Sequence, residues 1–141
     1  MAQDFERAVA FDSTSDINIG TTARTVVTSN SDDAIVGIRL ANVVTSQIKV
    51  DVYVESAAAG GSDLNIYLIK SAPIPVGSSL ELIDSGSKIV LQSGDELKVV
   101  SDTDASLNCW VSYVDGVTSA IQTQMDTKAS KGFATAMAIA L

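Results

Sequence analysis

The chain contains 141 residues, enough for one domain with a single sizeable core, and its hydrophobic content of 46% excludes general disorder. Nine lysine and arginine residues against seventeen aspartate and glutamate residues give a formal net charge of -8, which disfavours nucleic-acid and anionic-membrane partners. The chain has no histidine and one cysteine, so histidine-based triads, most zinc sites and an intrachain disulfide are excluded.

Residues 1–22 predict an extended N-terminal arm. Apolar residues such as Phe5 and Phe11 are scattered here without a long period, and we expect the segment to contribute an edge strand. The stretch MAQDFERAVAFDSTSD has no basic region followed by an apolar core and no small-residue cleavage site. We therefore expect no signal peptide and synthesis in a cytoplasm.

Eight segments of residues 23–115 have the length and composition of β-strands. They are short and rich in valine, isoleucine and leucine, and turn-forming glycine, asparagine, aspartate and serine residues separate them. Such spacing predicts an all-β domain, an antiparallel β-sandwich with a jelly-roll or other Greek-key arrangement of about eight strands. The predicted strands are Arg24–Ser29, Ala34–Asn42, Gln47–Glu55, Leu64–Ala72, Ser79–Ile83, Lys88–Leu91, Glu96–Ser101 and Leu107–Val114.

Two of these segments alternate strictly enough to assign their faces. The run QIKVDVYVE predicts a half-buried strand, because every second residue is apolar. Its predicted inward residues are Ile48, Val50, Val52 and Val54. The run AIVGIRLAN alternates similarly, with Val36, Ile38 and Leu40 on one face and Gly37, Arg39 and Ala41 on the other.

The segment after the fourth predicted strand is punctuated by prolines and tight turns. Pro73 and Pro75 cannot donate ladder hydrogen bonds, so they predict a strand end at a sheet edge and a crossover between sheets. The turn sequences DSGS and SGD predict two hairpins, which would make Ser79–Ser101 a meander.

Residues 116–141 predict a C-terminal assembly arm. Large apolar residues recur here at spacings of four or eight, which favours one face of a helix, whereas the partial alternation in FATAMAIAL favours an added β-strand. In either conformation the apolar face needs a cover, and we expect a neighbouring subunit to supply it.

The sequence offers little chemistry. Cys109 alternates in phase with apolar neighbours, so we expect a buried structural thiol rather than a nucleophile. Acidic pairs in two loops are a weak signal for calcium, because neither loop has the glycine and distal glutamate of a known calcium site. These pairs are Asp32 with Asp33 and Asp102 with Asp104. No pair of carboxylates is singled out for glycoside hydrolysis. We expect no enzyme, no cofactor and no metal.

Trp110 lies on the strand face opposite Tyr113, so at most one of the two belongs to the core. An exposed tryptophan on a strand favours a subunit contact. The alternative is a sugar-binding platform in which Trp110 acts with Tyr53 and Tyr67, although seven aromatic residues in the whole chain make such a platform sparse.

The runs IVGIRLANVVTSQIKVDVYVE and YLIKSAPIPVGSSLELIDSGSKIVLQSGDELKVVSDTDASLNCWVSYVD resemble a family of small structural proteins of tailed bacteriophages, especially phages of marine cyanobacteria. The resemblance spans about Val36 to Asp115, where the proline, glycine and aspartate punctuation matches in order. It implies a β-sandwich subunit of the virion and leaves the position on the particle open.

The leading functional hypothesis is a capsid decoration (cement) protein on the outside of the shell, because the chain is small, acidic, chemically inert and equipped with apolar arms. Its expected partners are other copies of itself, with a trimer favoured, and the major capsid protein. The alternatives are a neck, tail or fibre-associated subunit and a carbohydrate or host-receptor binding module. The predicted interface residues are Phe5, Phe11, Trp110, Phe133, Met137, Ile139 and Leu141.

Overall fold

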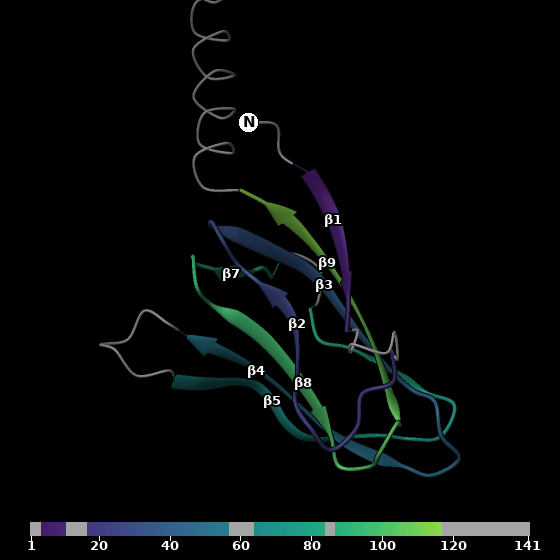
Figure 1. Ribbon diagram of the computed structural model, residues 1–141. Helices are drawn as coiled ribbons and strands as arrows, with labels where there is room; N and C mark the ends of the chain where they lie inside the picture. The colour runs from purple at the N-terminus through teal and green to yellow at the C-terminus, as the bar shows by residue number, and fades with distance from the viewer. Residues whose placement is uncertain (1–3, 11–16, 57–63, 84–86, 117–141) are drawn as a thin grey trace, which may run out of the picture.

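The computed structural model describes residues 4–10, 17–56, 64–83 and 87–116, and this part of the chain forms two antiparallel β-sheets packed face to face (Figure 1). Sheet A has the order β1-β9-β3-β6, with β7 also paired to β3; sheet B has the order β2-β8-β4-β5. The strands of sheet A are β1 (Asp4–Val9), β3 (Asp33–Asn42), β6 (Ser79–Glu81), β7 (Ile89–Leu91) and β9 (Leu107–Asp115). The strands of sheet B are β2 (Arg24–Thr28), β4 (Ile48–Ser56), β5 (Leu64–Ile74) and β8 (Glu96–Ser101).

The strand order is that of a jelly roll. β6 and β7 both pair with β3 and follow each other along its edge, so together they occupy the place of one strand. With that pair counted as the sixth strand in chain order, the first, eighth, third and sixth strands lie side by side in sheet A. The second, seventh, fourth and fifth strands lie side by side in sheet B. This double Greek-key winding confirms the predicted all-β sandwich.

All eight predicted strands are present, and β1 adds a ninth within the described residues. β1 pairs with β9 and forms the edge of sheet A, which confirms an edge strand from the N-terminal arm. Ile19 also reaches the sandwich through a bridge to Leu107. None of the described residues lies in a helix long and apolar enough to cross a membrane.

The core lies between the sheets and is lined by the alternating residues of the strands. The four predicted inward residues of β4 are all buried. Cys109 is buried among apolar side chains, and burial raises the pKa of its thiol to about 12. A thiol that ionises so weakly is a poor nucleophile, as the sequence pattern predicted.

One assignment in β3 is wrong. The alternation predicts that Val36 shares a face with Ile38 and Leu40, but the pairing of β3 with β9 shifts register between Ile35 and Gly37. This β-bulge inserts one residue and reverses the alternation, so Ile35 and Ile38 both enter the core. Val36 instead packs with the small outer cluster of Ala34 and Val114.

The predicted meander is also wrong. β6 and β7 do not pair with each other, and β8 lies in the opposite sheet. On β3, Arg39 pairs with Glu81 of β6, and Ile35 pairs with Ile89 of β7. The two β3 residues are four positions apart, whereas their two partners are eight positions apart. The number of residues between the two short strands is therefore larger than continuous pairing with β3 would require. Turn sequences indicate where the chain bends, but they do not specify which strand it then pairs with.

The proline-rich crossover is confirmed. Pro73 lies near the end of β5, an edge strand, and the next strand belongs to the other sheet. The buried Asn42 fastens this crossover, because its Nδ2 group donates to the carbonyl oxygens of Ser46 (2.8 Å), Ile74 (2.9 Å) and Pro75 (3.2 Å). Its Oδ1 accepts a hydrogen bond of 2.9 Å from the Val44 N–H.

Replacing Asn42 by alanine removes these bonds and leaves buried carbonyl groups without their donor. We expect Asn42→Ala to lower the free energy of unfolding by about 1–3 kcal/mol, measured by urea denaturation. The matched control is Asn65→Ala, at an exposed position of β5, which should change stability by no more than about 0.5 kcal/mol. Equal effects of the two substitutions would contradict the anchoring role of Asn42.

Candidate interaction face

The outer face of sheet A carries side chains that alternate away from the core. Phe5 and Arg7 of β1 lie opposite Val114 and Ser112 of β9, and Trp110 lies opposite Arg39 of β3. Phe5 is 83% exposed and Trp110 is 48% exposed. These are the two predicted interface residues that the structure describes, and it places them on the same face.

An apolar band crosses this face at the end of sheet A where β9 finishes, at Asp115. It consists of Phe5, Val114, Ala34 and Val90, which are successive partners on β1, β9, β3 and β7. Ala34 and Val114 are buried, whereas Phe5 and Val90 (60% exposed) project to solvent on either side. Large apolar side chains gathered on one face, rather than scattered singly, are typical of an interaction surface.

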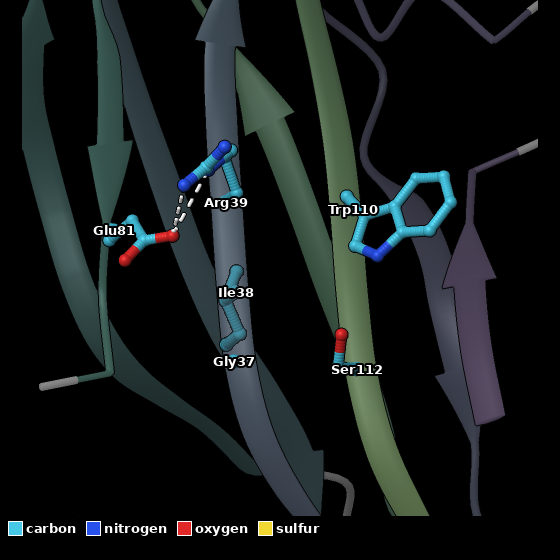
Figure 2. A pocket seen from close by; sticks show the side chains of 6 residues that line it. All are labelled: Gly37, Ile38, Arg39, Glu81, Trp110 and Ser112. Atoms are coloured by element: carbon cyan, nitrogen blue, oxygen red, sulfur yellow. Dashed lines mark hydrogen bonds and ion pairs between the residues drawn. The ribbon is translucent and has the colours of Figure 1, made fainter. Parts of the chain in front are cut away.

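A hollow of about 520 Å³ lies beside Trp110 on the same face. Gly37 and Ser112 form its floor, and Figure 2 shows the Arg39–Glu81 pair on one side of them, with the Trp110 indole directed toward β1 on the other. Gly37 contributes no side chain, so the hollow exists because glycine stands at the bulge of β3. Trp110 lies four residues, about 13 Å, from Val114 along β9, whereas Ser112 in the floor lies only two residues, about 7 Å, from Val114. The hollow therefore adjoins the apolar band without sharing its residues.

One arginine, Arg39, lines the hollow, and a second, Arg7, contacts its Trp110. Arg39 donates from Nε (3.0 Å) and Nη2 (2.8 Å) to the same oxygen, Oε1 of Glu81. The two side chains are 62% and 59% exposed, so this pair adds little to stability. The guanidinium carbon of Arg7 lies 5.3 Å from the centre of the Trp110 ring system, a cation–π contact that helps to fix the indole.

A polar cluster lies at the end of sheet A near the apolar band. The buried carboxylate of Asp33 accepts hydrogen bonds from the hydroxyls of Ser29 (2.9 Å) and Ser31 (3.0 Å) and from the Gly116 N–H (3.1 Å). The Ser31 hydroxyl also contacts Oδ1 of Asp115 at 3.1 Å. The cluster therefore joins the start of β3 to the point where the chain leaves β9.

The two carboxyls of this cluster have pKa values displaced in opposite directions. Burial raises the pKa of Asp33, but the hydrogen bonds that it accepts outweigh burial and hold the pKa below its ordinary value of 3.8. The hydrogen bond to Asp33 is the largest cause that raises the pKa of Asp115 above 3.8. Nearby, the Tyr113 hydroxyl donates to Oε2 of Glu6 at 2.6 Å, and this bond raises the pKa of Tyr113. The carboxylate oxygens of Asp33 are thus occupied by hydrogen bonds from the protein itself.

Other predicted site residues are not brought together. One acidic pair lies at the start of β3, where Asp32 precedes the strand and Asp33 is its first residue. The other pair, Asp102 and Asp104, lies in the loop before β9, and the start of β9 pairs with the opposite end of β3. Among the described residues no three potential ligands gather as a metal site. Phe11, Phe133, Met137, Ile139 and Leu141 lie outside the described residues.

The proposed three-aromatic platform is wrong. Tyr53 and Tyr67 pair across β4 and β5 with ring centroids 5.2 Å apart, and their strands belong to sheet B. Val52 and Val54 point into the core, so Tyr53 faces outward from sheet B while Trp110 faces outward from sheet A. The sandwich separates the two sites.

The sequence pattern did not single out Gly37, Arg39, Glu81 or Ser112 as a group. A glycine inside an otherwise β-branched strand is a recognised sign of a bulge or of space left for another molecule, and Gly37 carried that signal. The neighbours that complete the hollow could be found only from the pairing of β3 with β6 and β9.

No family model matches the sequence, and no curated protein matches it. Among solved structures, the fold is similar to the infectious bursal disease virus VP2 subviral particle, with a TM-score of 0.45 and 9% sequence identity. The alignment covers 82% of this chain and 33% of the VP2 chain, so this chain spans about one third of the length of that protein.

The opposite pKa displacements predict opposite effects of two substitutions. At pH 7 the Asp115 carboxyl carries a charge that the fold disfavours, so Asp115→Asn should raise the melting temperature. The difference in melting temperature between this variant and the parent protein should shrink as the pH falls through the raised pKa, because the Asp115 carboxyl of the parent then takes up a proton. Asp33→Asn should lower the melting temperature at pH 7, and this loss should shrink below about pH 3.8, where Asp33 contributes less.

Melting curves of both variants and the parent protein between pH 3 and pH 8 measure these effects, with the pH interval chosen to bracket ordinary carboxyl pKa values of about 4. Parallel curves, with differences independent of pH, would contradict the assignment of the two displaced pKa values.

Proposed function

We propose that this chain is a virion structural protein of a tailed bacteriophage and that it decorates the outside of the capsid. The observation that carries this proposal is the outer face of a jelly roll on which Phe5, Val90 and Trp110 remain exposed. Jelly rolls are a common architecture of viral shell domains, although the fold also serves lectins and cupins. The resemblance of residues 36–115 to phage structural proteins supports the same assignment.

The proposed mode of action is mechanical. The apolar band contacts a neighbouring subunit, either the major capsid protein or another copy of this chain, and thereby adds contacts that resist expansion of the shell. Fully burying a phenylalanine or valine side chain contributes about 1.5–3 kcal/mol, and repetition over many copies multiplies the effect. The net charge of -8 suits a surface directed toward water.

The role of residues 116–141 as an assembly arm and a trimeric state both belong to this proposal. In the second candidate function the same contacts hold the protein in the neck, the tail or a fibre. In both candidates the protein acts by binding, without catalysis.

The copy number of this chain in purified virions distinguishes the candidate positions. Quantitative mass spectrometry against the major capsid protein should give a ratio near one, or a simple fraction set by shell symmetry. A few copies per particle would move the protein to the neck, tail or fibre. Its absence from purified particles would contradict the virion assignment.

Substitution in the apolar band tests the contact itself. Phe5→Ser should reduce the occupancy of the protein on particles at least about tenfold, because the lost burial corresponds to more than about 1.4 kcal/mol. The folded monomer should be little affected, since Phe5 is 83% exposed. Ile66→Ser, at a 55% exposed position of β5 in the other sheet, is the matched control and should leave occupancy unchanged. Equal losses in both variants would contradict a specific contact through sheet A.

A further inference from the structure

We propose that the hollow between Trp110 and the Arg39–Glu81 pair is a binding site for a saccharide unit. This inference goes beyond the structural role and does not depend on it, because the residues that line the hollow are not those of the apolar band. The hollow is outlined by three kinds of group: an exposed aromatic ring, an exposed ion pair and a floor with little side-chain volume.

The indole supplies the apolar part of such a site. Trp110 is 48% exposed, and Figure 2 shows it at the margin of the hollow, directed toward β1. The cation–π contact with Arg7 holds the ring in place, which reduces the conformational entropy lost on binding. A pyranose ring presents a face of C–H groups that packs on an aromatic surface, while its hydroxyls project sideways.

The ion pair supplies the polar part. Arg39 donates from Nε and from Nη2 to one oxygen of Glu81, Oε1. The other carboxylate oxygen, Oε2, and the third guanidinium nitrogen, Nη1, take no part in these two bonds. The site thus presents a hydrogen-bond acceptor and a hydrogen-bond donor side by side. Neighbouring hydroxyls of a sugar, each of which donates and accepts, match this arrangement.

The floor leaves room for the ligand. Gly37 has no side chain and Ser112 has a short one with a hydroxyl, and the resulting volume of about 520 Å³ falls in the usual range of small-molecule sites, about 300–1,000 Å³. The pairing of β3 with β9 fixes this floor on two central strands of sheet A, so the site is formed before any ligand arrives.

Other occupants fit less well. The Glu81 carboxylate repels an anionic ligand such as a phosphate. A dry protein contact would have to bury the Arg39–Glu81 pair, whose loss of hydration is costly unless every donor and acceptor is matched. A neutral polyhydroxylated ligand meets the indole and the ion pair without either cost.

Because Trp110 is the single tryptophan of the chain, its fluorescence reports on this site alone. We would titrate the isolated protein with a panel of neutral hexoses, N-acetylhexosamines and their disaccharides up to their solubility limits. The expected result is a saturable change in emission with at least one of them, at a dissociation constant in the millimolar range or tighter, on the order of 1 mM. Saturation-transfer NMR measures the same binding without relying on tryptophan.

Three variants locate the binding. Gly37→Ala fills part of the floor, and its new methyl group meets only the Cβ of Ser112, at 3.9 Å, so the fold should be retained. Both Gly37→Ala and Trp110→Ala should weaken binding, the latter at least about tenfold by NMR. Tyr67→Ala, at an exposed aromatic residue on sheet B, is the control and should bind as the parent does.

The absence of saturable binding across the panel would overturn the proposal, and so would binding that Gly37→Ala and Trp110→Ala leave unchanged. If these two variants instead lose occupancy on particles while no saccharide binds, the hollow is a contact for a protein partner. Since the titration uses the isolated protein, its outcome is independent of the copy number found in virions.

Discussion

The pairing of β3 with β9 is the interaction on which the rest of the sandwich depends. It joins residues 33–42 to residues 107–115 in the middle of sheet A. β1 can then pair only with the free edge of β9, and β6 and β7 only with the free edge of β3. Because the two strands are far apart in the chain, their pairing carries a loop-closure cost that local contacts do not. The jelly roll follows from this closure.

The same pairing creates the candidate interaction face. The bulge between Ile35 and Gly37 reverses the alternation of β3, which keeps Ile35 and Ile38 in the core while a glycine comes to lie beneath the hollow. Without the bulge, a regular alternation would move one of these isoleucines to the surface. One local irregularity therefore serves both the packing of the core and the shape of the outer surface.

The sequence predicted the strands well and their partners poorly. Alternation in β4 identified its four buried residues, and Pro73 identified an edge strand before a crossover, because both signals are local. The separate docking of β6 and β7 on β3 is not local, and the turn between them looked like a hairpin.

The same distinction between local and non-local signals applies to the candidate face. Phe5 and Trp110 were each predicted to be contact residues, but only the register of β1 with β9 shows that they share a face. Neither residue type nor spacing along the chain indicated that Arg39, Glu81 and Ser112 surround the hollow, since three strands contribute them. The five other predicted interface residues lie outside the described part of the chain and stay predictions.

The described part of this protein fits the proposed role of a binding subunit. Its one thiol is buried, and Asp33, its most deeply placed carboxylate at the end of sheet A, is occupied by hydrogen bonds from neighbouring groups. Exposed apolar and aromatic side chains lie on sheet A at Phe5, Val90 and Trp110, and others lie on β5 of sheet B at Leu64, Ile66 and Tyr67.

Cryo-electron microscopy of purified particles tests the central claim most directly. We expect density with the strand order of this jelly roll at repeated, symmetry-related positions on the outside of the shell, with Phe5 and Val90 against a neighbouring subunit. Density for the sandwich at no position on the particle, or with the outer face of sheet A free and another surface in contact, would contradict it.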